Sequence, residues 1–174
     1  MREKTIKSKR IFSGRLLGLR EDTVKLDTGK ISKREICEHP GAVAIIAITA
    51  KKEIVLIRQY RKPAEQVLLE IPAGLFNKGE KLAAAAKREL EEETGFSAGK
   101  ISPAFSAYAS PGYSTELLHY FIATKLKKTG QHYEDDEQIE VDIVPIDKAF
   151  KMVKQGRIKD NKTVVGIIIA KWMN

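Results

Sequence analysis

The sequence has little cysteine and no long apolar run. Cys37 is the one cysteine among 174 residues, which excludes a disulfide within the chain. The longest apolar runs, residues 42–48 and 164–173, are shorter than the roughly 20 residues that a membrane-spanning helix needs. The basic start, MREKTIKSKR, is not followed by the apolar stretch of a signal peptide. These absences predict a soluble cytoplasmic protein with no membrane partner.

Charge of one sign is nowhere concentrated into a run of five or six residues. The chain nevertheless carries 31 Lys and Arg against 23 Asp and Glu, a net charge of +8. This excess favours an anionic partner, such as a nucleotide, a nucleic acid or an acidic metabolite, without choosing among them. The hydrophobic share of 43% is enough for a buried core, so disorder is not expected. The length suits one domain, or one domain with a small appendage.

The first 40 residues predict a small antiparallel β appendage. Short segments with partial apolar alternation lie at 5–11, 15–19, 23–26 and 31–37. The sequence Asp27-Thr28-Gly29-Lys30 suits a hairpin turn, because glycine can adopt a positive φ without a steric penalty. Pro40-Gly41 then interrupts the chain. We therefore assign residues 1–40 to the appendage and residues 41–174 to the main domain.

The rest of the chain alternates strands with helices. Residues 42–49 form a nearly continuous apolar run, as expected of a strand buried on both faces. A short turn at 51–52 joins this run to residues 53–60, which predicts that the two strands pair as a hairpin. Further strands are expected at 67–71, 101–109, 117–126 and 141–144, and helices at 81–94, 146–155 and 161–172. The pattern predicts an α/β (α+β) fold with a mixed sheet flanked by helices.

The helix expected at 81–94 carries three carboxylates in its last turn. Glu89, Glu92 and Glu93 lie three and four residues apart, just before Gly95, a suitable helix C-cap. The C-terminal end of a helix has partial negative charge, so carboxylates there cost energy unless a cation balances them. Oxygen ligands alone favour a hard ion, Mg²⁺ or Mn²⁺, over zinc. The alternative is a solvated acidic face, balanced by basic residues of the same helix.

Residues 74–96, GLFNKGEKLAAAAKRELEEETGF, resemble the Nudix box, G-x5-E-x7-R-E-U-x-E-E-x-G-U, in which U is a bulky apolar residue. Every fixed position is matched, by Gly74, Glu80, Arg88, Glu89, Leu90, Glu92, Glu93, Gly95 and Phe96. So many matches at fixed spacing make this a specific signal. The resemblance implies the Nudix fold, a mixed sheet sandwiched between helices. It also implies metal-dependent hydrolysis of a nucleoside diphosphate linked to another moiety.

The resemblance further implies roles for individual residues. Glu89 and Glu93 would ligate the metal together with the Ala73 carbonyl, and Glu92 would be a ligand or support one. Arg88 would orient Glu92, and we take both as catalytic candidates.

Segments outside the box resemble the ADP-ribose pyrophosphatase subgroup. They read RQYR (58–61), LEIPAG (69–74), SPGYSTE (110–116), EDDEQIE (134–140) and DNKT (160–163). The candidate substrate-binding residues that follow are Arg58, Arg61, Glu70, Leu75, Pro111, Gly112 and Glu116. The subgroup has a loop glutamate that helps to activate water or bind a further metal. Glu137 aligns best with it as a catalytic residue and metal ligand, with Glu134 as the alternative.

The leading hypothesis is therefore hydrolysis of the small molecule ADP-ribose to AMP and ribose 5-phosphate. The N-terminal strands of this subgroup commonly swap between protomers, which implies a homodimer. One alternative is a Nudix hydrolase for another nucleotide sugar or nucleoside diphosphate derivative, or for a capped or triphosphorylated RNA end. The Pro111 region argues against RNA, so a nucleic-acid partner is not expected. A non-catalytic ADP-ribose sensor is the other alternative, although such modules tend to lose box carboxylates that this chain retains.

Overall fold

The residues group by their contacts into two compact units in a computed structural model of the chain, which describes residues 2–130 and 138–173. The first unit comprises residues 1–41 and 107–118, and the second comprises residues 42–106 and 119–174. The chain therefore passes between the units three times, after residues 41, 106 and 118. The domain boundary expected after residue 40 stays a prediction.

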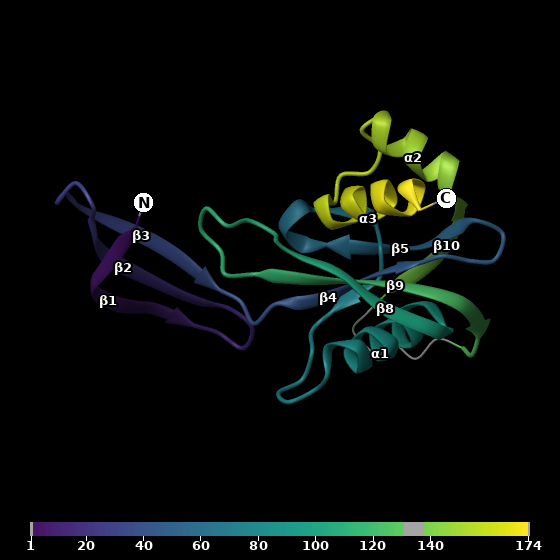
Figure 1. The fold of residues 1–174 in the computed structure, drawn as a ribbon, viewed down its shortest axis with the longest axis horizontal. Helices are drawn as coiled ribbons and strands as arrows, with labels where there is room; N and C mark the ends of the chain where they lie inside the picture. The colour runs from purple at the N-terminus through teal and green to yellow at the C-terminus, as the bar shows by residue number, and fades with distance from the viewer. Residues whose placement is uncertain (1, 131–137, 174) are drawn as a thin grey trace. The chain divides into compact units, whose positions relative to one another are not determined.

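The first unit is built on a three-stranded antiparallel sheet. Its order is β1 (Glu3–Ser13), β2 (Gly18–Leu26) and β3 (Ile31–Glu38) (Figure 1). The expected turn closes β2 onto β3, with Gly29 at φ +82° and its N–H donated to the Leu26 carbonyl at 2.9 Å. Two strands were expected at 15–19 and 23–26, but residues 18–26 form one strand and residues 15–17 precede it, because the polar residues at 20–22 pair with strands on both sides.

The second unit contains two sheets. One has the order β7 (Ala73–Gly74), β4 (Ala42–Ala47), β9 (Leu117–Lys128) and β8 (Phe96–Tyr108). The other has the order β10 (Ile139–Pro145), β5 (Glu53–Arg61) and β6 (Gln66–Glu70), with the short 3-10 helix η1 (Lys62–Ala64) joining β5 to β6. Residues 107–108 at the end of β8 and residues 117–118 at the start of β9 belong to the first unit.

The hairpin expected between residues 42–49 and 53–60 is wrong. The two strands meet beside their turn, in a bridge between Ile48 and Ile54. Beyond that bridge they diverge into different sheets, β4 beside β7 and β9, and β5 beside β6 and β10. All of β4 and residues 54–57 of β5 are buried on both faces, and each strand pairs along its length with segments more distant in the sequence.

Helices cover both sides of these sheets. α1 (Leu82–Thr94) packs against β4 and β7 on one side, whereas α2 (Ile146–Lys154) and α3 (Asn161–Trp172) pack against each other on the other side (Figure 1). The main core lies between α1 and the sheets and comprises Val43, Ile45, Ala47, Val55, Ala85, Ala86, Leu90, Phe96, Phe121 and Ala123. This arrangement confirms the predicted α/β fold class. No helix within the described residues is long and apolar enough to cross a membrane.

Candidate active site

The acidic helix ends where the sequence predicts. α1 stops at Thr94, and Gly95 follows in the left-handed conformation, with φ +67° and its N–H donated to the Glu91 carbonyl at 2.9 Å. The last turn contains no basic residue, and the Glu93 side chain in it is buried. Negative side chains therefore meet the negative end of the helix dipole with no cation of that turn to balance them.

One guanidinium organises the carboxylates of the box. Arg88 Nη1 donates to Glu89 Oε1 at 2.7 Å and to Glu92 Oε2 at 2.9 Å. The Nε and Nη2 atoms donate to the two Glu80 oxygens at 3.2 and 3.1 Å, and Nη2 also donates to the Leu75 carbonyl at 2.8 Å. These contacts, that with Glu80 above all, raise the pKa of Arg88 and lower that of Glu80. Arg88 thus stays charged and fixes three carboxylates at once.

Glu89 and Glu93 both contact strand β7. The Ala73 N–H donates to Glu93 Oε2 at 3.0 Å. The Glu89 carboxylate packs so closely on Gly74 that a Cβ added to this glycine would lie 2.2 Å from Glu89 Oε2. The absence of a side chain at Gly74 therefore leaves the space that Glu89 occupies.

These donors fit a hard divalent cation. Glu89 and Glu93 bring two carboxylates to the same two-residue strand, and Mg²⁺ and Mn²⁺ favour oxygen ligands of this kind. Glu92 is hydrogen-bonded to Arg88, as Glu89 also is. No three His, Cys, Asp or Glu side chains gather closely enough to hold an ion within residues 2–130 and 138–173.

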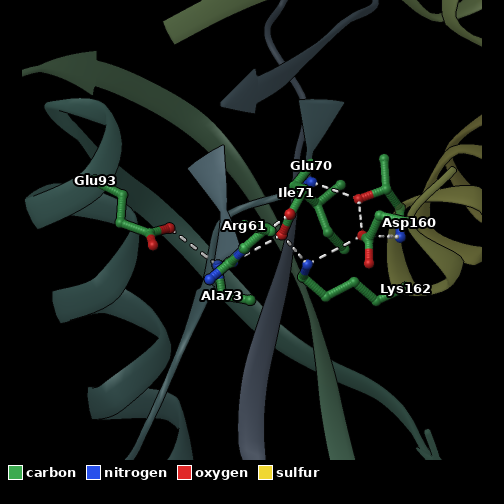
Figure 2. A network of polar contacts seen from close by, with 8 residues as sticks. Arg61, Glu70, Ile71, Ala73, Glu93, Asp160 and Lys162 are labelled. Atoms are coloured by element: carbon green, nitrogen blue, oxygen red, sulfur yellow. Dashed lines mark hydrogen bonds and ion pairs between the residues drawn. The ribbon is translucent and has the colours of Figure 1, made fainter. Parts of the chain in front are cut away.

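A second charged group lies beside β7, at the ends of β5 and β6 (Figure 2). Arg61 donates through Nε and Nη2 to the two Glu70 oxygens, both at 2.8 Å, and Lys162 from α3 also donates to Glu70. Burial of Glu70 favours its neutral form, but the hydrogen bonds from Arg61 and the charge of Lys162 outweigh this and hold its pKa below the ordinary value. The same bonds, with a smaller contribution from Glu93, raise the pKa of Arg61.

The site therefore combines the acidic end of α1, the backbone of residues 71–74, which we call the strap, and Arg61, which is bonded to Glu70. Residues 38–164 match the NUDIX domain. The chain belongs to the Nudix family.

Relatives match over nearly the whole chain. One is a methanol dehydrogenase activator of Bacillus methanolicus, 45% identical over 167 residues that cover 95% of this chain and 90% of the relative. Another is an ADP-ribose pyrophosphatase of Bacillus subtilis (strain 168), 43% identical over 169 residues that cover 96% and 91%. A crystal structure of an ADP compounds hydrolase superposes with a TM-score of 0.87 over 99% of this chain and 95% of that one. At 21% identity, this last match supports the Nudix fold alone.

Three other candidate residues, Arg58, Glu70 and Leu75, belong to the second unit. Arg58 forms an ion pair across β5 and β10 with Asp142, at 2.7 Å. Glu70 is 1% exposed, with both oxygens bonded within the protein. Leu75 has an exposed side chain and takes part in the box through its carbonyl.

Three further candidates belong to the first unit. Pro111, Gly112 and Glu116 belong to the 107–118 segment of the first unit, where Glu116 lies 3.9 Å from His39. Glu137 and Glu134 lie outside the described residues. The structure thus brings Glu80, Glu89 and Glu92 together around Arg88, and Arg61 together with Glu70.

Sequence reasoning gave no role to Lys162. The DNKT segment that contains it was noted as part of the family resemblance, and this was the available signal. Its contact with Glu70 spans 92 residues of sequence, a separation at which helix or strand periodicity carries no information.

Proposed function

We propose that this chain hydrolyses the pyrophosphate bond of ADP-ribose with a divalent cation, Mg²⁺ or Mn²⁺, giving AMP and ribose 5-phosphate. The observation that carries the proposal is the acidic end of α1 held on β7 beside the Arg61–Glu70 pair. The 43% identity to an ADP-ribose pyrophosphatase over almost the full length of both chains supports the choice of substrate.

The cation would be held by Glu89, Glu93 and the Ala73 carbonyl, with Glu92 as a further ligand or support. When bound, it supplies positive charge to the bridging phosphates and a site for water. Arg88 orients Glu89 and Glu92 before any ligand arrives, since it already donates hydrogen bonds to both.

Substrate recognition would use positive charge at Arg61. Glu70 occupies the Nε and Nη2 edge of the guanidinium, which leaves Nη1 for a phosphate or ribose oxygen. Glu70 would thereby contribute to substrate binding by holding Arg61 in position. Arg58, Leu75, Pro111, Gly112 and Glu116 remain candidates for contacts with the nucleoside and the terminal ribose.

The chemical step adds water across the P–O–P bond. The water oxygen bonds to one phosphorus, the bridging oxygen leaves with the other phosphate, and the proton of the water passes to a base. We assign that base, or the group that holds it in place, to the loop carboxylate Glu137, with Glu134 as the alternative.

Product analysis tests the function directly. Purified protein with Mg²⁺ would be offered ADP-ribose, other nucleotide sugars, diadenosine polyphosphates and 8-oxo-dGTP in parallel. Fastest release of AMP and ribose 5-phosphate from ADP-ribose supports the proposal. Faster cleavage of another compound would retain the Nudix chemistry and replace the substrate, and binding of ADP-ribose without cleavage would favour a sensor.

A homodimer is proposed from the first unit. All of β1 is exposed, and its apolar residues Ile6, Ile11 and Phe12 are each more than half exposed. A second copy of this strand would cover them. Ile11→Glu should lower the mass found by sedimentation equilibrium, whereas Ile143→Glu, at a partly exposed isoleucine of β10, should not. A wild-type chain that sediments as a monomer would contradict this proposal.

A second candidate function is activation of a methanol dehydrogenase, favoured by the 45% identity to the Bacillus methanolicus activator. The test adds the chain, or its Glu93→Gln variant, to a purified methanol dehydrogenase and follows the oxidation rate. Acceleration that also requires ADP-ribose hydrolysis would unite the two functions. No acceleration by either protein would remove this candidate.

A further inference from the structure

A chain of polar contacts joins the start of α3 to the end of β6 (Figure 2). Asp160, the N-cap of α3, accepts the Thr163 N–H at 3.0 Å and lies 3.0 Å from Lys162 Nζ. The Thr163 hydroxyl donates to Asp160 and accepts the Ile71 N–H at 2.7 Å. Lys162 completes the connection by donating to Glu70. The first turn of α3 therefore holds both the side chain of Glu70 and the backbone that follows it.

These contacts are nearly closed to water. The side chain of Glu70 is 2% exposed and that of Lys162 is 13% exposed. α3 also approaches the strap closely, since a Cβ added at Gly166 would lie 3.0 Å from Ile71 Cδ1. Ionic contacts in such a place are stronger than on the surface, and loss of one partner leaves the other charge buried with less compensation.

The strap held by α3 leads directly to the box. The Ile45 N–H donates to the Pro72 carbonyl at 2.8 Å, and the Ala73 N–H donates to Glu93. In the other direction, Glu70 holds Arg61 by two hydrogen bonds. Residues 70–73 thus connect Lys162, through hydrogen bonds, with the acidic helix and with Arg61.

The charges of the group explain what Lys162 contributes. Two cations, Arg61 and Lys162, face two carboxylates, Glu70 and Asp160, so the group is neutral before an anion binds. Without Lys162 the group would carry a net negative charge, and Arg61 would remain as the cationic partner of Glu70 among the described residues. Glu70 bonds to Nε and Nη2 of Arg61, so the guanidinium can present its other edge to an anionic ligand only while Glu70 keeps it in place.

We infer that Lys162 is a positioning residue, which fixes the Glu70 carboxylate and thereby aims Arg61 at the phosphates of the substrate. This inference rests on the proposed function for its substrate. It adds that the start of α3, remote in sequence from the box, sets the affinity for the anion.

The kinetic test compares Lys162→Met with Lys171→Met. Both lysines belong to α3 and form ion pairs, but Lys171 pairs with Asp147 at the surface. Lys162→Met should raise the KM for ADP-ribose by about tenfold and change kcat much less, because one charge-assisted contact is lost and the reacting atoms are untouched. Lys162→Arg should restore much of the affinity, and Lys171→Met should match the wild type. A fall in kcat at unchanged KM would indicate a purely structural role and overturn the inference.

A double-mutant cycle shows whether Lys162 acts through Arg61. In an Arg61→Met background, Lys162→Met should have no further effect on KM, because the residue it positions is gone. An equal effect in both backgrounds would overturn the inference. Should Lys162→Met not fold, Lys162→Gln takes its place in the cycle.

A readout without substrate separates this inference from the proposed function. The Arg61 Nε–H, identified in ¹⁵N-arginine-labelled protein by its loss in Arg61→Met, should exchange with water several-fold faster in Lys162→Met than in wild type or Lys171→Met. Unchanged exchange in Lys162→Met would overturn the inference whatever the enzyme cleaves. A wild type that does not hydrolyse ADP-ribose would instead overturn the proposed function and leave this result standing.

Discussion

Gly74→Ala is expected to disable the active site without unfolding the protein. Gly74 does not have a positive φ, so alanine meets no backbone strain there. Its Cβ would lie 2.2 Å from Glu89 Oε2, whereas ordinary contact begins at 3.4 Å. The obstructing atoms are the end of a flexible side chain, so the Glu89 carboxylate must retreat by more than 1 Å while the strand stays in place.

A displacement of this size in a catalytic constellation costs about a hundredfold in rate. We therefore expect kcat for ADP-ribose to fall by about that factor, with a free energy of unfolding in urea close to that of the wild type. Gly79→Ala is the matched control, since Gly79 has φ +82° and open space around it. Alanine there should cost roughly 1–2 kcal/mol of stability through its left-handed backbone and leave kcat unchanged. Near-normal kcat in Gly74→Ala would refute the argument that Glu89 must rest on this glycine.

Three further outcomes are expected. Glu93→Gln should abolish metal-dependent turnover and leave the fold intact, because the amide oxygen can still accept the Ala73 N–H. Circular dichroism checks the fold. Substantial activity in this variant would contradict the role of Glu93 as a metal ligand. Glu137→Gln should slow the chemical step by about a hundredfold or more, as measured in single turnovers, whereas a loss confined to Glu134→Gln would move the base to that residue. The pKa of Glu70 is depressed in the fold, so its contribution to stability is present above the unfolded value of about 4.3 and is lost as the pH falls through the folded value. Urea unfolding between pH 6 and pH 3 should accordingly show a shallower pH dependence for Glu70→Gln than for the wild type, and identical slopes would argue against the paired carboxylate.

The sequence predicted the features that depend on local spacing. The acidic end of α1 and its Gly95 cap follow from helical periodicity and from the preference of glycine for a left-handed conformation. The turn at Gly29 follows from the same preference. These signals are contained within about one helical turn of sequence, so no tertiary information is needed to read them.

Features that depend on distant partners were not predictable in this way. A run of buried apolar residues indicates a strand but not its neighbour, and β4 pairs with β7 and β9 instead of β5. Glu70 holds Arg61, and Glu70 is itself bonded to Lys162, which lies 92 residues away in the sequence. Arg88 was expected to orient Glu92, but its hold on Glu80 and on the Leu75 carbonyl depends on the path of the loop before α1.

The three crossings between the units bear on how such a chain can be shortened or recombined. Residues 107–118 are bonded to the end of β3: the Cys37 N–H donates to the Tyr113 carbonyl at 2.7 Å, and the Thr115 N–H to the Cys37 carbonyl at 3.0 Å. A chain shortened to begin at residue 42 would keep α1, Arg61 and Lys162 but deprive this segment of its partner. The N-terminal strands are therefore not a removable module. In a chimaera of this chain with a relative, residues 1–41 and 107–118 would have to come from the same parent protein.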